Sequence, residues 1–167
     1  GDTSLSGETD LAIGHAPGTM LSPFIAASAL TGGLTPASLV WDIAEGLPPE
    51  ILAEAGESLT FRGPLRLRSA LAGGRAAGLA RLLLQTGQER TWNLAAALGA
   101  PGLNTLPADG AALFGGGSLQ PLELAQALTV FSQEGVRRQT PELPGAVLIL
   151  RVEDRSGRRL LENAPLS

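Results

Sequence analysis

The sequence predicts a mainly α-helical fold with one small β-hairpin near its C-terminal end. Leu, Ala and Gly dominate the 167 residues and only 4% are aromatic, which favours packed helices over an aromatic-rich β-sandwich. Several apolar stretches begin with a Pro and end at a Gly, a pattern typical of helices. The last segment, "GAVLILRVEDRSGRRLLE", instead has an apolar strand, a D-R-S-G turn and a second strand, which indicates a hairpin.

We expect one domain with an irregular segment over 1–14, helices within 15–136 and the hairpin within 143–163. Ser22 is predicted to cap the first helix, with Pro23 at its first helical position. The predicted helical stretches are, in chain order, "SPFIAASAL", "LTPASLVWDIAEG", "LPPEILAEAG", "LRSALAGGRAAGLARLLLQTG", "ERTWNLAAALGA" and "QPLELAQALTVFSQEG".

Glycines and prolines set the boundaries of these elements. "TGG" over 31–33 should end the first helix, while Thr35 and Pro36 should begin the second. Gly73 and Gly74 are read by default as a packing site inside a long helix, with a break as the alternative. "SLTFRGPLRL" alternates weakly around a Gly-Pro turn, and "PGLNTLPADGAALFGGGS" is predicted to be a long loop.

The composition excludes several classes of function. The net charge is −4 and no basic stripe is visible, so we expect no nucleic-acid partner. The absence of Cys excludes thiolate chemistry, and one His among scattered acids argues against a metal site, so neither metal nor cofactor is expected. All twelve basic residues are Arg, so the chain lacks Lys, the usual deprotonable amine of active sites. No apolar run spans a bilayer, and we expect membrane attachment only through other parts of the protein.

Three local patterns invite a functional interpretation. His15 and Ser22 resemble a hydrolase pair with Asp10 as the nearest acid, but the role of Ser22 as a helix cap explains it without catalysis. The glycines over 115–117 are more typical of a tight turn than of a phosphate cradle, because no G-K-[ST] follows. The arginine pairs at 137–138 and 158–159 are typical of solvated surface, with binding of a carboxylate ligand or of an anionic surface as the alternative.

Four stretches together resemble one family, the penicillin-binding transpeptidases. "PGTMLSPF" is similar to P-G-S-[ST]-x-K-P-F, and "TPASLVWD" to T-P-x-x-x-V-x-D. "FRGPLRLRSALAGG" is similar to F-x-G-P-V-[ST]-L-R-E-A-L-x-x-S, and "GGSLQPLELAQALTVFSQEGV" to G-x-x-x-T-P-L-E-L-A-x-A-Y-x-x-F-A-N-G-G-V. They follow the family's order from Pro17 to Val136, and the closest resemblance is to the transpeptidase half of bifunctional class A proteins of the 1C kind. The resemblance implies the helical part of a serine β-lactamase-like fold with an incomplete sheet.

The resemblance also implies three catalytic signatures, S-x-x-K, S-x-N and K-T-G. Here Thr19 stands at the position of the nucleophilic Ser, and Ser22 at that of the Lys base. Gly74 and Ala76 stand at the S-x-N positions, and no K-T-G occurs. The framework positions remain: Pro17, Gly18, Pro23, Phe24, Pro36, Gly63, Pro64, Pro121 and Glu123. Framework residues that match the family's pattern beside replaced catalytic residues are typical of a pseudoenzyme, so no catalytic residue is expected.

The resulting hypothesis is a catalytically silent, transpeptidase-like domain of an extracytoplasmic protein of peptidoglycan synthesis. The full-length protein would be membrane-anchored, and the partners would be a peptidoglycan stem peptide or a neighbouring glycosyltransferase domain. One alternative is an active D,D-transpeptidase in which Thr19 is the acyl acceptor and His15 replaces the Lys base. Another is a non-catalytic fragment of a larger glycosyltransferase and transpeptidase.

Overall fold

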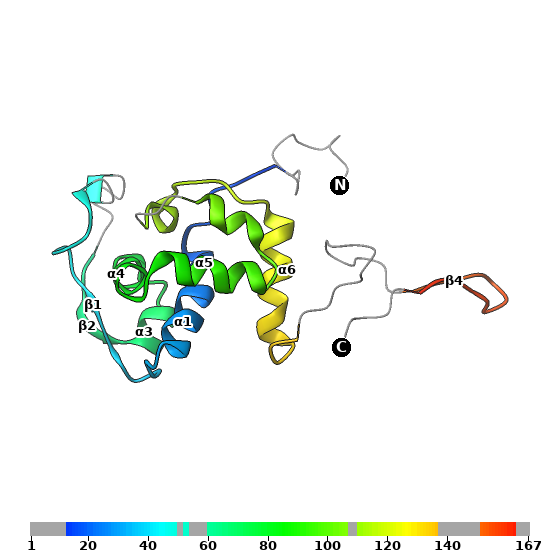
Figure 1. The fold of residues 1–167 in the computed structure, drawn as a ribbon, viewed down its shortest axis with the longest axis horizontal. Helices are drawn as coiled ribbons and strands as arrows, with labels where there is room; N and C mark the ends of the chain where they lie inside the picture. Colours follow the sequence, from blue (N-terminus) through cyan, green and yellow to red (C-terminus); the bar gives the residue numbers. More distant parts are fainter. Residues whose placement is uncertain (1–12, 50–51, 54–59, 107–109, 137–150, 163–167) are drawn as a thin grey trace.

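The structure is a computed structural model and describes residues 13–49, 52–53, 60–106, 110–136 and 151–162. The α-helices are α1 (Ser22–Thr31), α3 (Leu67–Ala72), α4 (Ala76–Thr86), α5 (Gln88–Ala97) and α6 (Pro121–Ser132). Short 3₁₀ helices are η1 (Gly18–Leu21), η3 (Pro101–Thr105) and η4 (Ala111–Phe114). The strands are β1 (Leu39–Asp42), β2 (Gly63–Arg66), β3 (Arg151–Glu153) and β4 (Arg159–Glu162), in two antiparallel pairs. The predicted fold class is confirmed (Figure 1).

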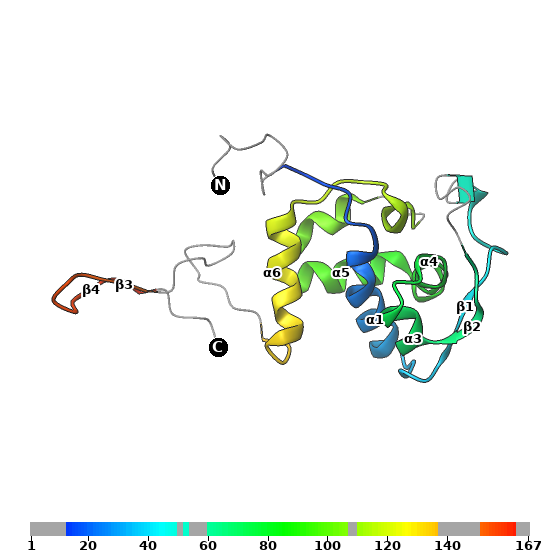
Figure 2. The same ribbon diagram turned by 180° about the vertical axis from the view of Figure 1, so that it is seen from behind.

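Helix α1 lies at the centre of the helical body, in contact with α3, α4 and α5 (Figures 1 and 2). Its Phe24 and Ile25 are fully buried, as are Leu79 and Leu83 of α4. Phe24 also meets Phe131 of α6 edge to face, with ring centroids 5.5 Å apart. The apolar residues that the sequence places in helices therefore form one core around α1. Within the described residues, no helix has the length and apolar character needed to cross a membrane.

The helix predicted to begin at Thr35 is wrong, because this stretch forms a turn and then strand β1. The Thr35 amide donates to Ser38 Oγ and the Ser38 amide donates to the Thr35 carbonyl, both at 2.9 Å. Pro36 fits the second position of a turn as well as the first position of a helix, so the Thr-Pro pattern is ambiguous. Pairing with β2, more than 20 residues away in the chain, decides the outcome.

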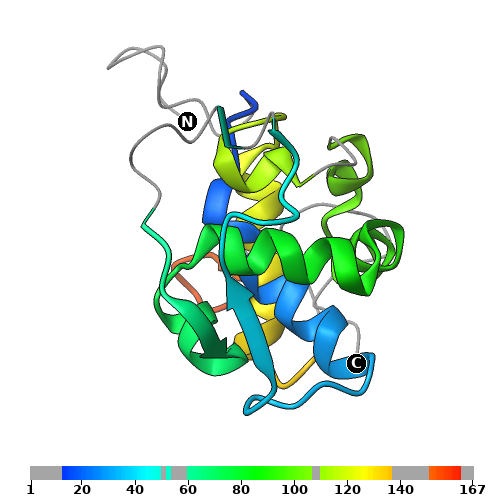
Figure 3. The same ribbon diagram turned by 90° about the vertical axis from the view of Figure 1, so that its left-hand side faces the viewer.

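Strand β1 lies beside α4 (Figure 3), and its residues alternate between exposed and buried. Val40 and Asp42 are buried and face α4, whereas Leu39 and Trp41 are 63% and 50% exposed. Gly78 of α4 allows this close approach, since a Cβ there would lie 3.2 Å from Val40 Cγ1. The close helix–strand contact expected at Gly73 and Gly74 is therefore found at Gly78 instead.

The long helix predicted over 67–87 is also wrong, because it is broken between α3 and α4. Gly73 ends α3 and Gly74 adopts a φ of +56°, a conformation that favours glycine and interrupts the helix. The Arg75 amide then donates to the Ala70 carbonyl at 2.9 Å, which closes the turn before α4 begins. The default interpretation of the two glycines as a packing site is therefore replaced by the alternative, a break.

The predicted long loop after α5 contains two short 3₁₀ helices, η3 and η4. The Glu123 carboxylate of α6 accepts a hydrogen bond from the Gly102 amide in the first turn of η3. A carboxylate is favourable there because free backbone N–H groups point toward it. Gly115, with a φ of +111°, ends η4 in a tight turn.

The remaining helices and the hairpin follow the predictions where they are described. Helices α1, α5 and α6 are confirmed, and the Gly135 amide donates to the Val130 carbonyl just after α6. Strands β3 and β4 pair around a turn in which Asp154 accepts hydrogen bonds from two backbone amides and from the Ser156 hydroxyl. The hairpin strands are exposed throughout. Residues 1–12, 137–150 and half of the predicted helix "LPPEILAEAG" (50–51 and 54–56) lie outside the described residues.

Candidate functional site

Three of the four positions matched to the transpeptidase signatures line one cavity of about 450 Å³. Thr19 and Ser22 enter it from the η1–α1 junction, and Gly74 from the turn between α3 and α4. The other lining residues are Met20, Pro23, Leu71, Ala72 and Leu128. We call this cavity the groove.

The η1–α1 junction sets the different environments of Thr19 and Ser22. Gly18, with a φ of +54°, opens η1, and η1 continues directly into α1. Thr19 is exposed on this turn, whereas Ser22 is only 4% exposed. Thr19 is therefore an exposed residue of the groove, whereas the Ser22 hydroxyl is turned toward the Thr19 carbonyl.

The predicted N-cap role of Ser22 is wrong. Ser22 is already helical, with φ −53° and ψ −40°, and its hydroxyl donates a hydrogen bond to the Thr19 carbonyl. An N-cap side chain would instead accept a bond from an amide farther along the helix. The preceding 3₁₀ turn removes the extended conformation that such a cap requires. Pro23 remains in the first turn of α1 as predicted.

A buried ion pair holds the turn that carries Gly74. Asp42 of β1 is fully buried and accepts hydrogen bonds from Arg75 Nε at 2.9 Å and from the Arg62 amide at 3.1 Å. Arg75 Nη2 also lies 2.8 Å from Asp42 Oδ2. Because Arg75 follows Gly74 directly, the pair ties this wall of the groove to β1. Ala76, the fourth matched position, is the first residue of α4 and does not line the groove.

The groove contains no side chain that titrates near neutral pH. Its lining holds two hydroxyls, and all other lining side chains are apolar or absent. Acyl transfer to a hydroxyl needs a base within hydrogen-bond reach. The Ser22 hydroxyl already donates a hydrogen bond to the Thr19 carbonyl, and a hydroxyl is itself only a weak base. The described groove can therefore receive an apolar or neutral ligand without a group that activates Thr19.

His15 lies outside the groove. Its amide and carbonyl pair with Leu119 at 2.9 Å, which joins the segment before η1 to the segment before α6. Within the described part of the chain, no carboxylate forms an ion pair with His15, and Asp10 lies outside that part. The same residues hold no group of three His, Asp or Glu side chains close enough to bind a metal ion.

The apolar walls of the groove were not predicted. Met20 is 55% exposed beside Thr19, while Leu71 and Leu128 come from α3 and α6. No local pattern unites them, because they are brought together only by the packing of α3 and α6 beside α1. The resemblance of the separate motifs is the one signal in the sequence that links these segments.

Comparisons with known proteins agree with the resemblance. No protein-family model matches the chain. Penicillin-binding protein 1A of Vibrio cholerae is 32% identical over 125 residues, which are 71% of this chain and 15% of that protein. Penicillin-binding protein 1A of Pseudomonas aeruginosa is 31% identical over 153 residues, 89% of this chain and 18% of that protein. The chain thus spans less than a fifth of the length of these relatives.

A solved structure extends the likeness to the fold. The crystal structure of penicillin-binding protein 1A from Haemophilus influenzae matches with a TM-score of 0.65 and 26% identity, over 89% of this chain and 22% of that one. The matched relatives are of the 1A kind, and the finer expectation of the 1C kind stays a prediction. The roles assigned to Thr19, Ser22, Gly74 and Ala76 likewise stay predictions.

Proposed function

We propose that this chain, a homologue of penicillin-binding protein 1A over most of its own length, is a transpeptidase-like domain without acyl-transfer activity. Its role would be structural or binding, within an extracytoplasmic protein of peptidoglycan synthesis. One observation carries the proposal: three of the positions matched to the signatures share one groove, and that groove has no titratable side chain.

The chemistry of the residues at the four matched positions supports the proposed absence of acyl-transfer activity. A Thr hydroxyl is a poor nucleophile until a base takes its proton. Ser22 stands where the base is expected and is not basic near neutral pH, and the chain contains no Lys that could replace it. Gly74 and Ala76 carry no hydroxyl or amide side chain for proton relay. Loss of one member of such a unit costs factors of thousands or more, and further losses add little.

The primary test is covalent labelling with a fluorescent penicillin, read on a denaturing gel beside an active penicillin-binding protein. We expect no label that survives denaturation. The matched variants are Thr19→Ala and Ser22→Ala, which remove the two hydroxyls of the groove one at a time. Stoichiometric labelling that disappears in Thr19→Ala and persists in Ser22→Ala would show that Thr19 is acylated and would refute the proposal.

The binding role has its own test, because a largely apolar groove with the exposed residue Thr19 in its lining can hold a ligand without reacting. The ligands for this test are peptides that end in D-Ala-D-Ala, which represent the peptidoglycan stem peptide expected as a partner. When such a peptide is added to the ¹⁵N-labelled chain, the backbone amide resonances of Thr19 and Gly74 should shift, while those of the exposed β3–β4 hairpin should stay fixed. The absence of any shift at high peptide concentration would favour a structural role, with a neighbouring glycosyltransferase domain as the partner.

A further inference from the structure

Within the described residues, the sheet formed by β1 and β2 is covered on one face only. Directly opposite residues of an antiparallel pair share a face of the sheet. The register places Leu39 opposite Arg66 and Trp41 opposite Pro64, and all four residues are exposed. The residues of β1 that point the other way are buried and lie against α4. We call the surface formed by Leu39, Trp41, Pro64 and Arg66 the outer face.

The outer face is largely apolar although it is in contact with water. Leu39 and Trp41 are each at least half exposed, and Phe61, which comes just before β2, is exposed as well. A single exposed apolar side chain is ordinary, but a group of adjacent ones indicates an interaction site. Trp and Arg are enriched among the residues that contribute most of the binding energy at protein–protein interfaces. The combination of Trp41 and Arg66 on one face therefore favours a protein partner.

The charge around the outer face is positive. Residues 58–88 contain five of the twelve Arg and no Asp or Glu, although the whole chain has a net charge of −4. Arg75 is held in the buried ion pair with β1. Arg62, Arg66 and Arg68 are exposed, and none of them forms an ion pair with another described residue. The outer face thus combines apolar surface with positive charge that the described residues do not neutralise.

We propose that the outer face binds an acidic segment of a partner protein. A large apolar side chain of the segment packs on Trp41 and Leu39, and carboxylates of the same segment pair with Arg66 and its neighbours. Arg suits this role because its guanidinium can hold a carboxylate through two parallel hydrogen bonds. A second copy of this chain would instead bring the same positive face against itself. The inference does not rest on the absence of acyl transfer, because the groove contains no residue of β1 or β2.

A random peptide library displayed on phage tests the chemistry of the partner without knowledge of its sequence. The whole chain is the bait, and the Arg66→Glu variant is used first to remove peptides that bind elsewhere. The enriched peptides should be rich in Asp and Glu and should contain a large apolar residue. Synthetic copies of them should bind less tightly as the salt concentration rises, because salt screens exposed charges.

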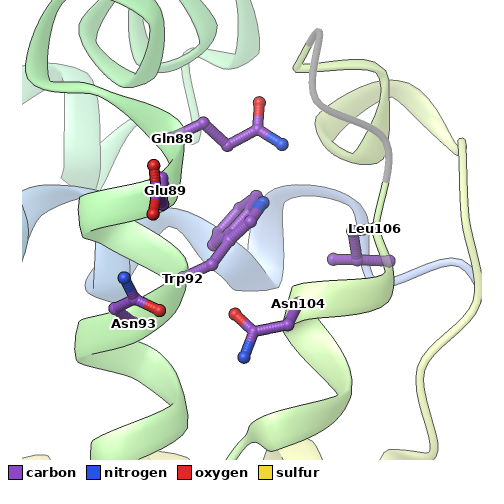
Figure 4. Close-up of a pocket in the computed structure, with 6 residues that line it drawn as sticks. All are labelled: Gln88, Glu89, Trp92, Asn93, Asn104 and Leu106. Atoms are coloured by element: carbon purple, nitrogen blue, oxygen red, sulfur yellow. The ribbon is translucent and has the colours of Figure 1, made fainter.

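The two Trp residues of the chain show where an enriched peptide binds. In a ¹H–¹⁵N spectrum, the peptide should shift the indole resonance of Trp41. Trp92 is the internal reference, because its indole nitrogen is buried. It lines a separate cavity of about 340 Å³ between α5 and η3, the α5–η3 cavity (Figure 4). The Trp92 resonance should stay in place, and the Trp41→Ala variant, which lacks one of the two resonances, assigns them.

Variants then test the two kinds of contact. Trp41→Ala should weaken binding of the enriched peptides about thirtyfold, as is usual for a central aromatic residue of an interface. Arg66→Glu reverses one charge and should weaken binding about tenfold. Arg155→Glu is the matched control, because Arg155 is exposed in the β3–β4 turn, and it should change the affinity less than about twofold. If Trp41→Ala unfolds, Arg66→Glu and the indole shift of the unmodified chain still decide.

Four results would overturn the proposal. The first is a selection in which no enriched peptide shifts the Trp41 resonance. The second is enrichment of basic or uncharged peptides, which would contradict the role of the Arg side chains. The third is a dimer in sedimentation that Trp41→Ala abolishes, which would make a second copy the occupant. The fourth is binding to phosphatidylglycerol vesicles in place of peptides, which would assign the outer face to a lipid surface.

Discussion

The buried Asp42–Arg75 pair gives the sharpest stability prediction. Asp42 is fully buried, whereas the Arg75 side chain is 17% exposed. In Asp42→Ala, Arg75 loses its partner and the Arg62 amide loses its acceptor. Removal of one member of a buried pair costs about 3–5 kcal/mol. We expect the lower end, about 3 kcal/mol, because the partly exposed guanidinium can turn toward water.

This free energy translates into a measurable change in melting temperature. For a chain of this size, 1 kcal/mol corresponds to about 2–4 °C, so Asp42→Ala should melt about 6–12 °C lower. Chemical denaturation should show a lower midpoint with an unchanged slope, the sign of altered stability rather than an altered denatured state. Circular dichroism at 222 nm follows both transitions.

A double-mutant cycle separates the pair from its surroundings. Arg75→Met leaves the Asp42 carboxylate buried without its cation and should destabilise at least as much as Asp42→Ala. The double variant should cost less than the sum of the two single variants, by about 1–3 kcal/mol. Arg158→Met is the matched control, because Arg158 is 78% exposed in its pair with Asp154, and its loss should change stability by less than about 0.5 kcal/mol. A loss below about 1 kcal/mol in Asp42→Ala, or strict additivity, would refute the reasoning.

Three further predictions concern other contacts. Gly78→Leu should lower the free energy of unfolding by about 1–3 kcal/mol, because α4 has no room for a side chain against β1. A denaturation midpoint no lower than that of the unmodified chain would contradict this. Glu123→Ala should cost about 1–3 kcal/mol by leaving the Gly102 amide unpaired, with Glu123→Gln intermediate in the same melts. Hydrogen bonds from the Ser156 side chain and from backbone amides hold the pKa of Asp154 below its usual 3.8. Its contribution to the hairpin is therefore present above pH 3.8 and lost as pH falls through the lower folded pKa, which the Ser156 amide shift should follow.

The helices that were predicted correctly have signals within a single stretch of sequence. Pro23 and Pro121 lie in the first turns of α1 and α6, and Gly32 and Gly99 follow the ends of α1 and α5. These residues act through their own backbone preferences, so the sequence alone suffices.

The two wrong helices fail for a physical reason that they share. Thr35 and Pro36 satisfy the rules for a helix start, but pairing of β1 with β2 supersedes them, and such pairing depends on residues far apart in the chain. At Gly74 the sequence allows either a helix or a positive φ, and the Arg75 contact with Asp42 selects the second. Local propensity is a weak prior wherever tertiary contacts of this strength exist.

The candidate site was predictable in part. The motif resemblance named Thr19, Ser22 and Gly74, which the structure brings into one groove, and Ala76, which it does not. The α5–η3 cavity had no such signal, because it forms only where Trp92 meets a 3₁₀ helix that was predicted to be a loop.

The contact of Gly78 with β1 also has a consequence for strand pairing. Successive residues of a strand face opposite ways, so a slip of β1 by one residue would turn Trp41 toward α4 and expel Asp42 into water. A helix surface with space only for Val40 would reject the indole, and Arg75 would lose its partner. Gly78 and the Asp42–Arg75 pair thus both disfavour a shifted register and favour the observed pairing of β1 with β2.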